Sequence, residues 1–105
     1  MEISGIILAG GGSRRMGVNK ALLEMEGVPI IKSIAAQLSA VADNVMISCS
    51  DMDRNNNTYQ FLGWPIVIDH YPSLGPLGGL HAGLSSSRTE WNAVSACDLP
   101  FVTKE

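Results

Sequence analysis

The sequence predicts an α/β protein with a mostly parallel, doubly wound sheet of the Rossmann-like type, and three observations support this fold class. Four short apolar runs are spaced along the chain, at Ile3 to Leu8, Val45 to Ser48, Ile66 to Ile68 and Trp91 to Ala96. Segments with helical periodicity or turn residues separate these runs, which is the order of elements in parallel sheets. Polar or glycine-rich residues follow the runs, where open α/β sheets bind their ligands.

The segments between the strands differ in how strongly they predict structure. We expect Ala21 to Glu26 to be extended or a turn, and a helix to cover Pro29 to Val41, where apolar residues recur with helical spacing. Asp51 to Asn57 is polar enough to predict a mobile turn, and Thr58 to Leu62 predicts a short, weak helix. A further helix is expected from Pro76 to Ser85, because proline favours the first position of a helix.

Composition and charge exclude several classes of protein. With 105 residues, 46% of them hydrophobic and 16% charged, residues 1–105 are expected to form a single packed domain. The net charge of -3 argues against nucleic-acid binding, and no apolar run approaches the length of a membrane span. Cys49 and Cys97 have neither zinc-site nor disulfide spacing and are expected to be reduced and buried. The N-terminal apolar run is too short for a signal peptide, so we expect a cytoplasmic protein.

The stretch from Leu8 to Lys20, LAGGGSRRMGVNK, has the composition of an anion site. Glycines allow backbone amides to approach phosphate oxygens, and Arg15 and Lys20 add mobile positive charge, although a glycine-rich turn with solvated cations has the same composition. Two known phosphate loops do not fit. Val18 and Asn19 stand where the P-loop requires Lys and Ser/Thr, and Arg15 stands where the dinucleotide fingerprint requires its third glycine.

The same stretch resembles the signature of the nucleotide-sugar-type nucleotidyltransferases, L-A-G-G-x-S-x-R-M-G-x-x-K. Its fixed positions are filled without a gap by Leu8, Ala9, Gly10, Gly11, Ser13, Arg15, Met16, Gly17 and Lys20. Within that superfamily the chain is most similar to the molybdenum cofactor guanylyltransferases, the MobA family, from Ile6 to about Val102. The resemblance implies nucleotide contacts from the loop, namely from Leu8, Ala9, Gly10, Gly11, Gly12, Ser13 and Lys20.

A second motif, GPLGGL from Gly75 to Leu80, follows Asp69 at the end of the third predicted strand. By itself it predicts a loop and a helix that starts at proline, with backbone amides available at the helix N-terminus. It resembles the base-binding segment of the guanylyltransferases, which implies nucleotide contacts from Asp69, Gly75, Pro76, Leu77 and Gly78. The family has an asparagine near the end of the second strand, where this chain has Ser48, Cys49 and Ser50 instead. His70 and His81 are interpreted as structural or surface residues.

A third motif, CDLPF from Cys97 to Phe101, follows the fourth predicted strand. Asp98 has two interpretations: the N-cap of a helix that Pro100 begins, or a ligand of the Mg²⁺ that accompanies a nucleoside triphosphate. A hard carboxylate at the carboxyl end of a strand suits the metal, and the pattern resembles the family at this point. We therefore favour Asp98 as the metal ligand and Mg²⁺ as the cofactor.

The resemblance implies transfer of GMP from GTP to molybdopterin that carries molybdenum, with release of pyrophosphate. The acceptor phosphate attacks the α-phosphorus, so catalysis would consist of positioning and charge stabilisation by Arg15, Lys20, the loop amides and the Mg²⁺ on Asp98. Two alternatives remain open. One is another nucleotidyltransferase, which uses CTP or a sugar phosphate, and the other is a non-catalytic GTP-binding fragment.

The resemblance also predicts properties that depend on length. Family members continue well past 105 residues, so we expect the nucleotide-binding, N-terminal half of a longer enzyme, truncated after about four strands and inactive by itself. The family's strand order begins 3-2-1-4, which would leave one edge of the fourth strand unpaired. Trp91, Ala93, Val94 and Ala96 make that edge apolar, which predicts self-association of the chain.

Overall fold

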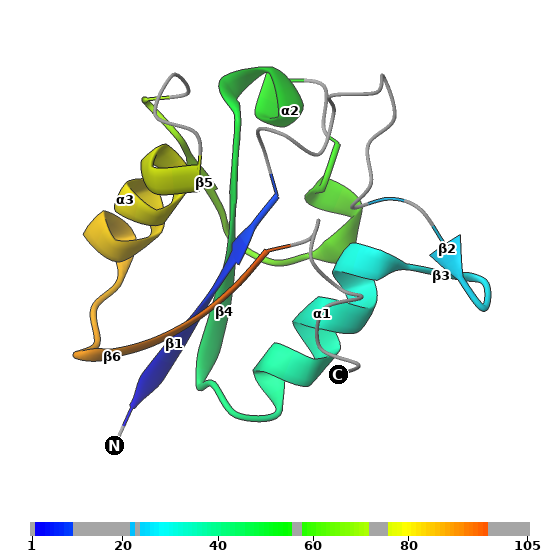
Figure 1. The fold of residues 1–105 in the computed structure, drawn as a ribbon, viewed down its shortest axis with the longest axis horizontal. Helices are drawn as coiled ribbons and strands as arrows, with labels where there is room; N and C mark the ends of the chain where they lie inside the picture. The colour runs from blue at the N-terminus through cyan, green and yellow to red at the C-terminus, as the bar shows by residue number, and fades with distance from the viewer. Residues whose placement is uncertain (1, 10–21, 23, 56–57, 72–75, 97–105) are drawn as a thin grey trace.

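The chain folds into an α/β domain around a four-stranded parallel sheet (Figure 1). In this computed structural model the described residues are 2–9, 22, 24–55, 58–71 and 76–96. The strands of the sheet are β1 (Ile3–Leu8), β4 (Asn44–Cys49), β5 (Ile66–Ile68) and β6 (Trp91–Ala96). Their order is β5-β4-β1-β6, so the predicted fold class and the predicted strand order 3-2-1-4 are confirmed.

The other elements connect the strands. The helices are α1 (Ile30–Ser39), α2 (Asp51–Asn55) and α3 (Pro76–Ser86), with a 3₁₀ turn, η3, at Gln60–Leu62. A short antiparallel hairpin precedes α1 and consists of β2 (Glu24–Met25) and β3 (Val28–Pro29). The helices predicted at Pro29 to Val41 and at Pro76 to Ser85 are confirmed as α1 and α3, with slightly different ends. The longest described helix has 11 residues, and no helix in the described part of the chain is long and apolar enough to cross a membrane.

The helices α1 and α3 pack on opposite faces of β1, and each does so at a residue without a side chain. A Cβ on Gly5 of β1 would lie 2.7 Å from Cγ of Leu38 in α1. On the other face, a Cβ on Gly83 of α3 would lie 2.5 Å from Cγ2 of Ile6 in β1. These glycines therefore allow both layers of helix to approach the central strand closely.

The main core lies between α1 and the sheet. Alternate residues of β1 and β4 face this side, together with one face of α1 and residues from the ends of the strands. The buried residues of this cluster are Ile7, Ala9, Ile31, Ala35, Leu38, Val45, Ile47, Cys49 and Tyr59. The buried positions of α1 recur at helical spacing, as the sequence predicted, and burial of such side chains stabilises the fold by about 1.5–3 kcal/mol each.

The prediction of a turn from Asp51 to Asn57 was wrong, because the segment begins with the helix α2. Ser50 caps this helix: its Oγ accepts a hydrogen bond from the backbone N–H of Asp53, with 3.1 Å between the atoms. The side chain of Asp53 is buried and approaches that of Thr58, whose Oγ1 lies 3.4 Å from Oδ1. The residues that directly follow β4 thus form a capped helix.

Within the described residues no strand pairs with the outer edge of β6, and the groups on that edge can be assigned atom by atom. The carbonyl of Ile3 and the N–H of Ala9 both bond towards β4, so the even-numbered residues of β1 bond towards β6. Because β6 is parallel to β1 with Ile6 opposite Val94, the main-chain groups of Ala93 and Ser95 face β1. The N–H and C=O groups of Asn92, Val94 and Ala96 therefore point outwards.

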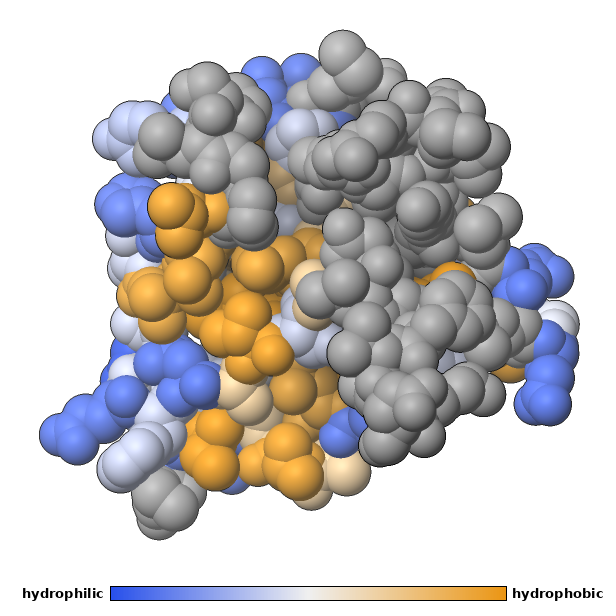
Figure 2. Space-filling model, viewed as in Figure 1, coloured by the Kyte–Doolittle hydropathy of each residue, from blue (hydrophilic) through white to orange (hydrophobic). Residues whose placement is uncertain are grey.

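The surface next to this edge is apolar. Trp91 and Val94 on β6 are 59% and 44% exposed, and Leu77 and Leu84 on α3 are 64% and 46% exposed. Figure 2 shows hydrophobic surface over α3 and the neighbouring part of β6 on this face of the molecule. Ala93 is an exception to the predicted apolar edge, because it is half-buried against the α1 side of the core.

Candidate functional site

The carboxyl ends of β1, β4 and β5 meet the first turn of α3 at one edge of the sheet (Figure 1). Hydrogen bonds connect these ends. The N–H of Ala9 donates to the carbonyl of Ser48 at 2.9 Å, and the N–H of Asp69 donates to the carbonyl of Cys49 at 2.8 Å. The Oγ of Ser48 donates to the carbonyl of Gly79 at 2.9 Å. The residues that introduce the first two motifs, Ala9 and Asp69, therefore lie at the same edge, as predicted.

Asp69 lies against the first turn of α3. Its Oδ1 accepts a hydrogen bond from the N–H of Tyr71 at 2.7 Å. A Cβ on Gly78 would overlap both carboxylate oxygens of Asp69 and the carbonyl oxygen of Tyr71, so only glycine fits there. The N-terminal turn of a helix favours a negative charge. A carboxylate with two oxygens also keeps the capacity to accept hydrogen bonds from a ligand.

Ala9 is fixed through both of its main-chain groups. Its N–H bonds to Ser48, and its carbonyl oxygen accepts a hydrogen bond from the hydroxyl of Tyr59 at 2.8 Å. Ala9 and Tyr59 are both fully buried. The sequence reasoning missed Ser48 and Tyr59 as parts of the site. A usable signal for this segment was the S-x-x-D pattern from Ser50 to Asp53, which is typical of a helix N-terminus.

The predicted site residues fall into two groups. Among those that are described, Asp69 and Gly78 are in contact, and Ala9 lies at the same edge on the other side of β4. Leu8 precedes Ala9, Pro76 begins α3, and Leu77 is largely exposed. The other predicted residues lie outside the described ones: Gly10, Gly11, Gly12, Ser13, Arg15, Lys20, Gly75 and Asp98. The first of these, Gly10, follows Ala9 directly in the sequence, and Asp98 is the second residue after β6.

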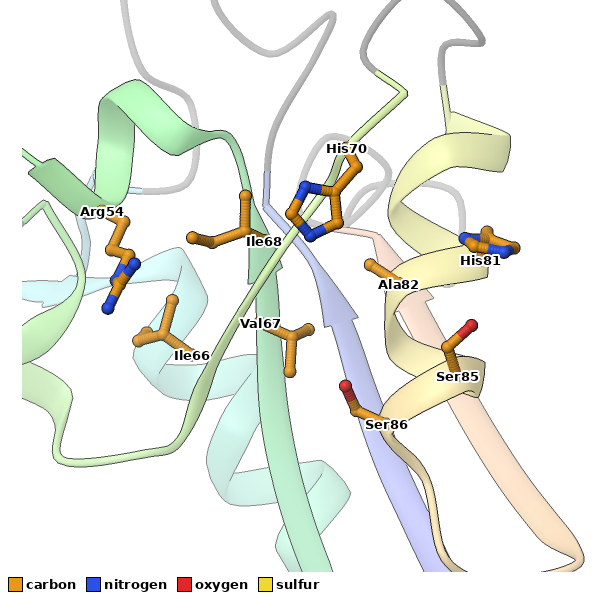
Figure 3. A pocket seen from close by; sticks show the side chains of 9 residues that line it. All are labelled: Arg54, Ile66, Val67, Ile68, His70, His81, Ala82, Ser85 and Ser86. Atoms are coloured by element: carbon orange, nitrogen blue, oxygen red, sulfur yellow. The ribbon is translucent and has the colours of Figure 1, made fainter.

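A hollow of about 370 Å³ lies beside this edge, between β5, α2 and α3 (Figure 3). Both histidines line this hollow, and in Figure 3 His70 points into the space between β5 and α3. His81 packs edge to face with Tyr71, with 5.2 Å between the ring centroids. Both histidines are exposed, in agreement with their interpretation as surface residues. Within the described ranges, no three His, Cys, Asp or Glu side chains are grouped so that they could hold a metal ion.

The fold and this edge define a class of protein: open α/β domains with a parallel sheet, in which ligands bind at the carboxyl ends of the strands. The chain belongs to one family within this class, the MobA-like NTP transferase domain family, whose model matches residues 5–105. The match covers almost the whole sequence and agrees with the resemblance seen in its motifs.

Individual relatives agree with this assignment. The chain is 36% identical to a probable molybdenum cofactor guanylyltransferase of Natronomonas pharaonis, over 99% of this chain and 53% of the relative. It is 41% identical to a molybdenum cofactor guanylyltransferase of Cupriavidus metallidurans, over 96% of this chain and 49% of the relative. The chain thus spans about half the length of the curated relatives it matches.

A solved structure supports the fold. The crystal structure of molybdopterin-guanine dinucleotide biosynthesis protein A from Archaeoglobus fulgidus superposes on this domain with a TM-score of 0.69. The superposition covers 93% of this chain and 48% of that chain, at 22% sequence identity. At this identity the likeness concerns the fold.

The packing of Asp69 against α3 predicts different outcomes for two neighbouring glycines. Gly78→Ala should lower the free energy of unfolding by about 1–3 kcal/mol, because the new methyl group must displace Asp69 or the carbonyl of Tyr71. Gly79→Ala is the matched control, since its Cβ would meet only the Ser48 Oγ at 3.3 Å and Leu8 Cδ2 at 3.5 Å. Alanine also favours a helix over glycine by about 1 kcal/mol. Urea denaturation of both variants tests this, and equal stabilities would contradict the packing.

Proposed function

We propose that this chain is the nucleotide-binding part of a molybdenum cofactor guanylyltransferase. GTP would bind at the carboxyl edge of the sheet, and GMP would be transferred to molybdopterin that carries molybdenum, with release of pyrophosphate. One observation carries the proposal: Ala9, where the glycine-rich sequence begins, lies at the same edge as Asp69 and Gly78 of the second motif. The names of the relatives suggest the reaction.

The carboxylate of Asp69 supports guanine as the base. Guanine presents two adjacent N–H donors on its Watson–Crick edge, whereas adenine and cytosine each present a donor beside an acceptor. A carboxylate accepts hydrogen bonds but donates none when ionised, so it matches guanine best. The position of Asp69 beside the first turn of α3 holds its oxygens at the ligand edge. This match argues against the alternative of a nucleotidyltransferase that uses CTP.

The phosphates and the metal would be bound by the other motifs. The glycine-rich sequence supplies amides, and Arg15 and Lys20 supply positive charge, which together stabilise phosphate oxygens by charge-assisted hydrogen bonds. Mg²⁺ is commonly held by one or two carboxylates together with substrate phosphates. Asp98, close behind β6 in the sequence, fits this donor set, and Mg²⁺ would neutralise charge on the phosphates. Because the chain spans half of its relatives, nucleotide binding is the property to test on it.

The first test concerns the base and Lys20. GTP with Mg²⁺ should bind more tightly than CTP or ATP by isothermal titration calorimetry. Lys20→Ala should weaken GTP binding about tenfold to a hundredfold, because a charge-assisted contact worth about 1.5–3 kcal/mol is lost. Arg88→Ala is the control, since Arg88 is exposed and follows the C-terminal end of α3, whereas the ligand edge lies at the first turn of that helix. Equal affinities of the wild type and Lys20→Ala for GTP would show that the glycine-rich sequence does not bind the phosphates.

The second test separates the two interpretations of Asp98. Asp98→Asn keeps an acceptor for an N-cap hydrogen bond but removes the charge that would hold Mg²⁺. We expect the variant to melt at the wild-type temperature while its GTP binding no longer depends on Mg²⁺. Asp51→Asn, at an exposed aspartate of α2, should leave the Mg²⁺ dependence intact. An unchanged Mg²⁺ dependence in Asp98→Asn would identify Asp98 as a cap.

We also propose that the chain associates with a second copy through β6. The outward N–H and C=O groups of Asn92, Val94 and Ala96 allow a two-fold antiparallel pairing, with Val94 opposite Val94 of the other copy. No residue from Trp91 to Ala96 carries a charge that would oppose this pairing. The exposed Val94 and the exposed leucines of α3 would be covered in the same interface.

Proline substitutions test this association. Val94→Pro removes an N–H that points away from β1, so the fold should persist while the outward edge can no longer pair. Ala93→Pro is the matched control, because its N–H faces β1 and its loss should destabilise the sheet. Sedimentation velocity should show a concentration-dependent dimer for the wild type and a monomer for Val94→Pro. A monodisperse wild-type monomer at high concentration would contradict the proposal.

A further inference from the structure

The carbonyl of Ala9 lies where the parallel ladder between β1 and β4 ends. The N–H of Ala9 bonds to Ser48, and in a regular parallel ladder the carbonyl of Ala9 would then accept from the N–H of Ser50. However, β4 ends at Cys49, and Ser50 turns away to cap α2. The hydroxyl of Tyr59 supplies the replacement donor, at 2.8 Å from the Ala9 oxygen.

Tyr59 is held in place by the segment between β4 and β5. Its ring is fully buried in the core cluster. The N–H of the preceding residue, Thr58, donates to the carbonyl of Asp53 at 2.9 Å, and the carbonyl of Tyr59 accepts from the N–H of Leu62 at 3.1 Å. Asp53 belongs to α2, which Ser50 caps. These hydrogen bonds fix the backbone on both sides of Tyr59 and therefore the position of its hydroxyl relative to Ala9.

We propose that Tyr59 is a positioning residue for the phosphate-binding sequence. The Ala9 carbonyl belongs to the peptide bond that leads into that sequence, and a peptide bond is planar. Whatever orients this carbonyl consequently orients the N–H of the same peptide bond, which is the first amide of the glycine-rich sequence. The inference rests on the proposed function, because it assigns Tyr59 a role in binding the triphosphate rather than in stability alone.

Tyr59→Phe tests this role, because it keeps the ring in the core and removes only the hydroxyl. We expect the affinity for GTP with Mg²⁺ to fall about tenfold, as for loss of one buried hydrogen bond. Ile31→Val is the matched control: Ile31 is fully buried in the same cluster, and the change lowers stability without removing a hydrogen bond. It should melt as low as Tyr59→Phe and still bind GTP like the wild type.

Hydrogen exchange provides a readout that does not require nucleotide. In the absence of ligand, the backbone amides of peptides that contain Ala9 should exchange faster in Tyr59→Phe than in the wild type or in Ile31→Val. Wild-type affinity in Tyr59→Phe, or equal weakening in Ile31→Val, would overturn the positioning role. If the wild type bound no GTP, the proposed function would be wrong. Hydrogen exchange would then test the anchoring of Ala9 by itself, and equal exchange rates in Tyr59→Phe and the wild type would overturn it.

Discussion

The structure depends on the burial of β1 on all sides. This strand pairs with β4 on one edge and β6 on the other, and α1 and α3 cover its two faces. Ile6 and Ile7 are fully buried, and the close approach of the helices requires the missing side chains of Gly5 and Gly83. A strand held in this way has little freedom to shift in register. The point at which the chain leaves it, at Ala9, is therefore fixed relative to β4 and α3.

The candidate site follows from this constraint. Ser48 joins two of its parts, because its carbonyl accepts from Ala9 while its hydroxyl donates to Gly79 in α3. Ser48 is buried, so both of its bonds are protected from water and are worth more than surface bonds would be. Asp69 is placed from the other side by the end of β5 and by Gly78. In the proposed function, phosphate and base groups would thus be bound by segments far apart in sequence, each of which is hydrogen-bonded to the end of β4.

The strands could be predicted from the sequence, but the helix α2 and the contact between Gly78 and Asp69 could not. The runs Ile3 to Leu8, Ile66 to Ile68 and Trp91 to Ala96 matched the observed strands, because a short apolar run between turns has few other stable arrangements in a parallel sheet. The helix α2 was missed because its five residues, four of them polar, show no periodicity, although Ser50 and Asp53 have cap spacing. The contact of Gly78 with Asp69 could not be predicted, since it depends on how closely α3 approaches β5.

The early end of the β1–β4 ladder explains why Ser50 and Tyr59, which the sequence did not identify, matter for the site. A glycine-rich sequence that binds phosphate must leave the sheet so that its amides are not used by a neighbouring strand. If β4 continued past Cys49, its next N–H would bond to the carbonyl of Ala9 and extend the ladder. The turn at Ser50 prevents this, but it leaves a buried carbonyl that would be destabilising without a donor. A side-chain hydroxyl satisfies that carbonyl without extending the sheet. Tyr59, which follows the turn at Ser50 in the sequence, provides this hydroxyl.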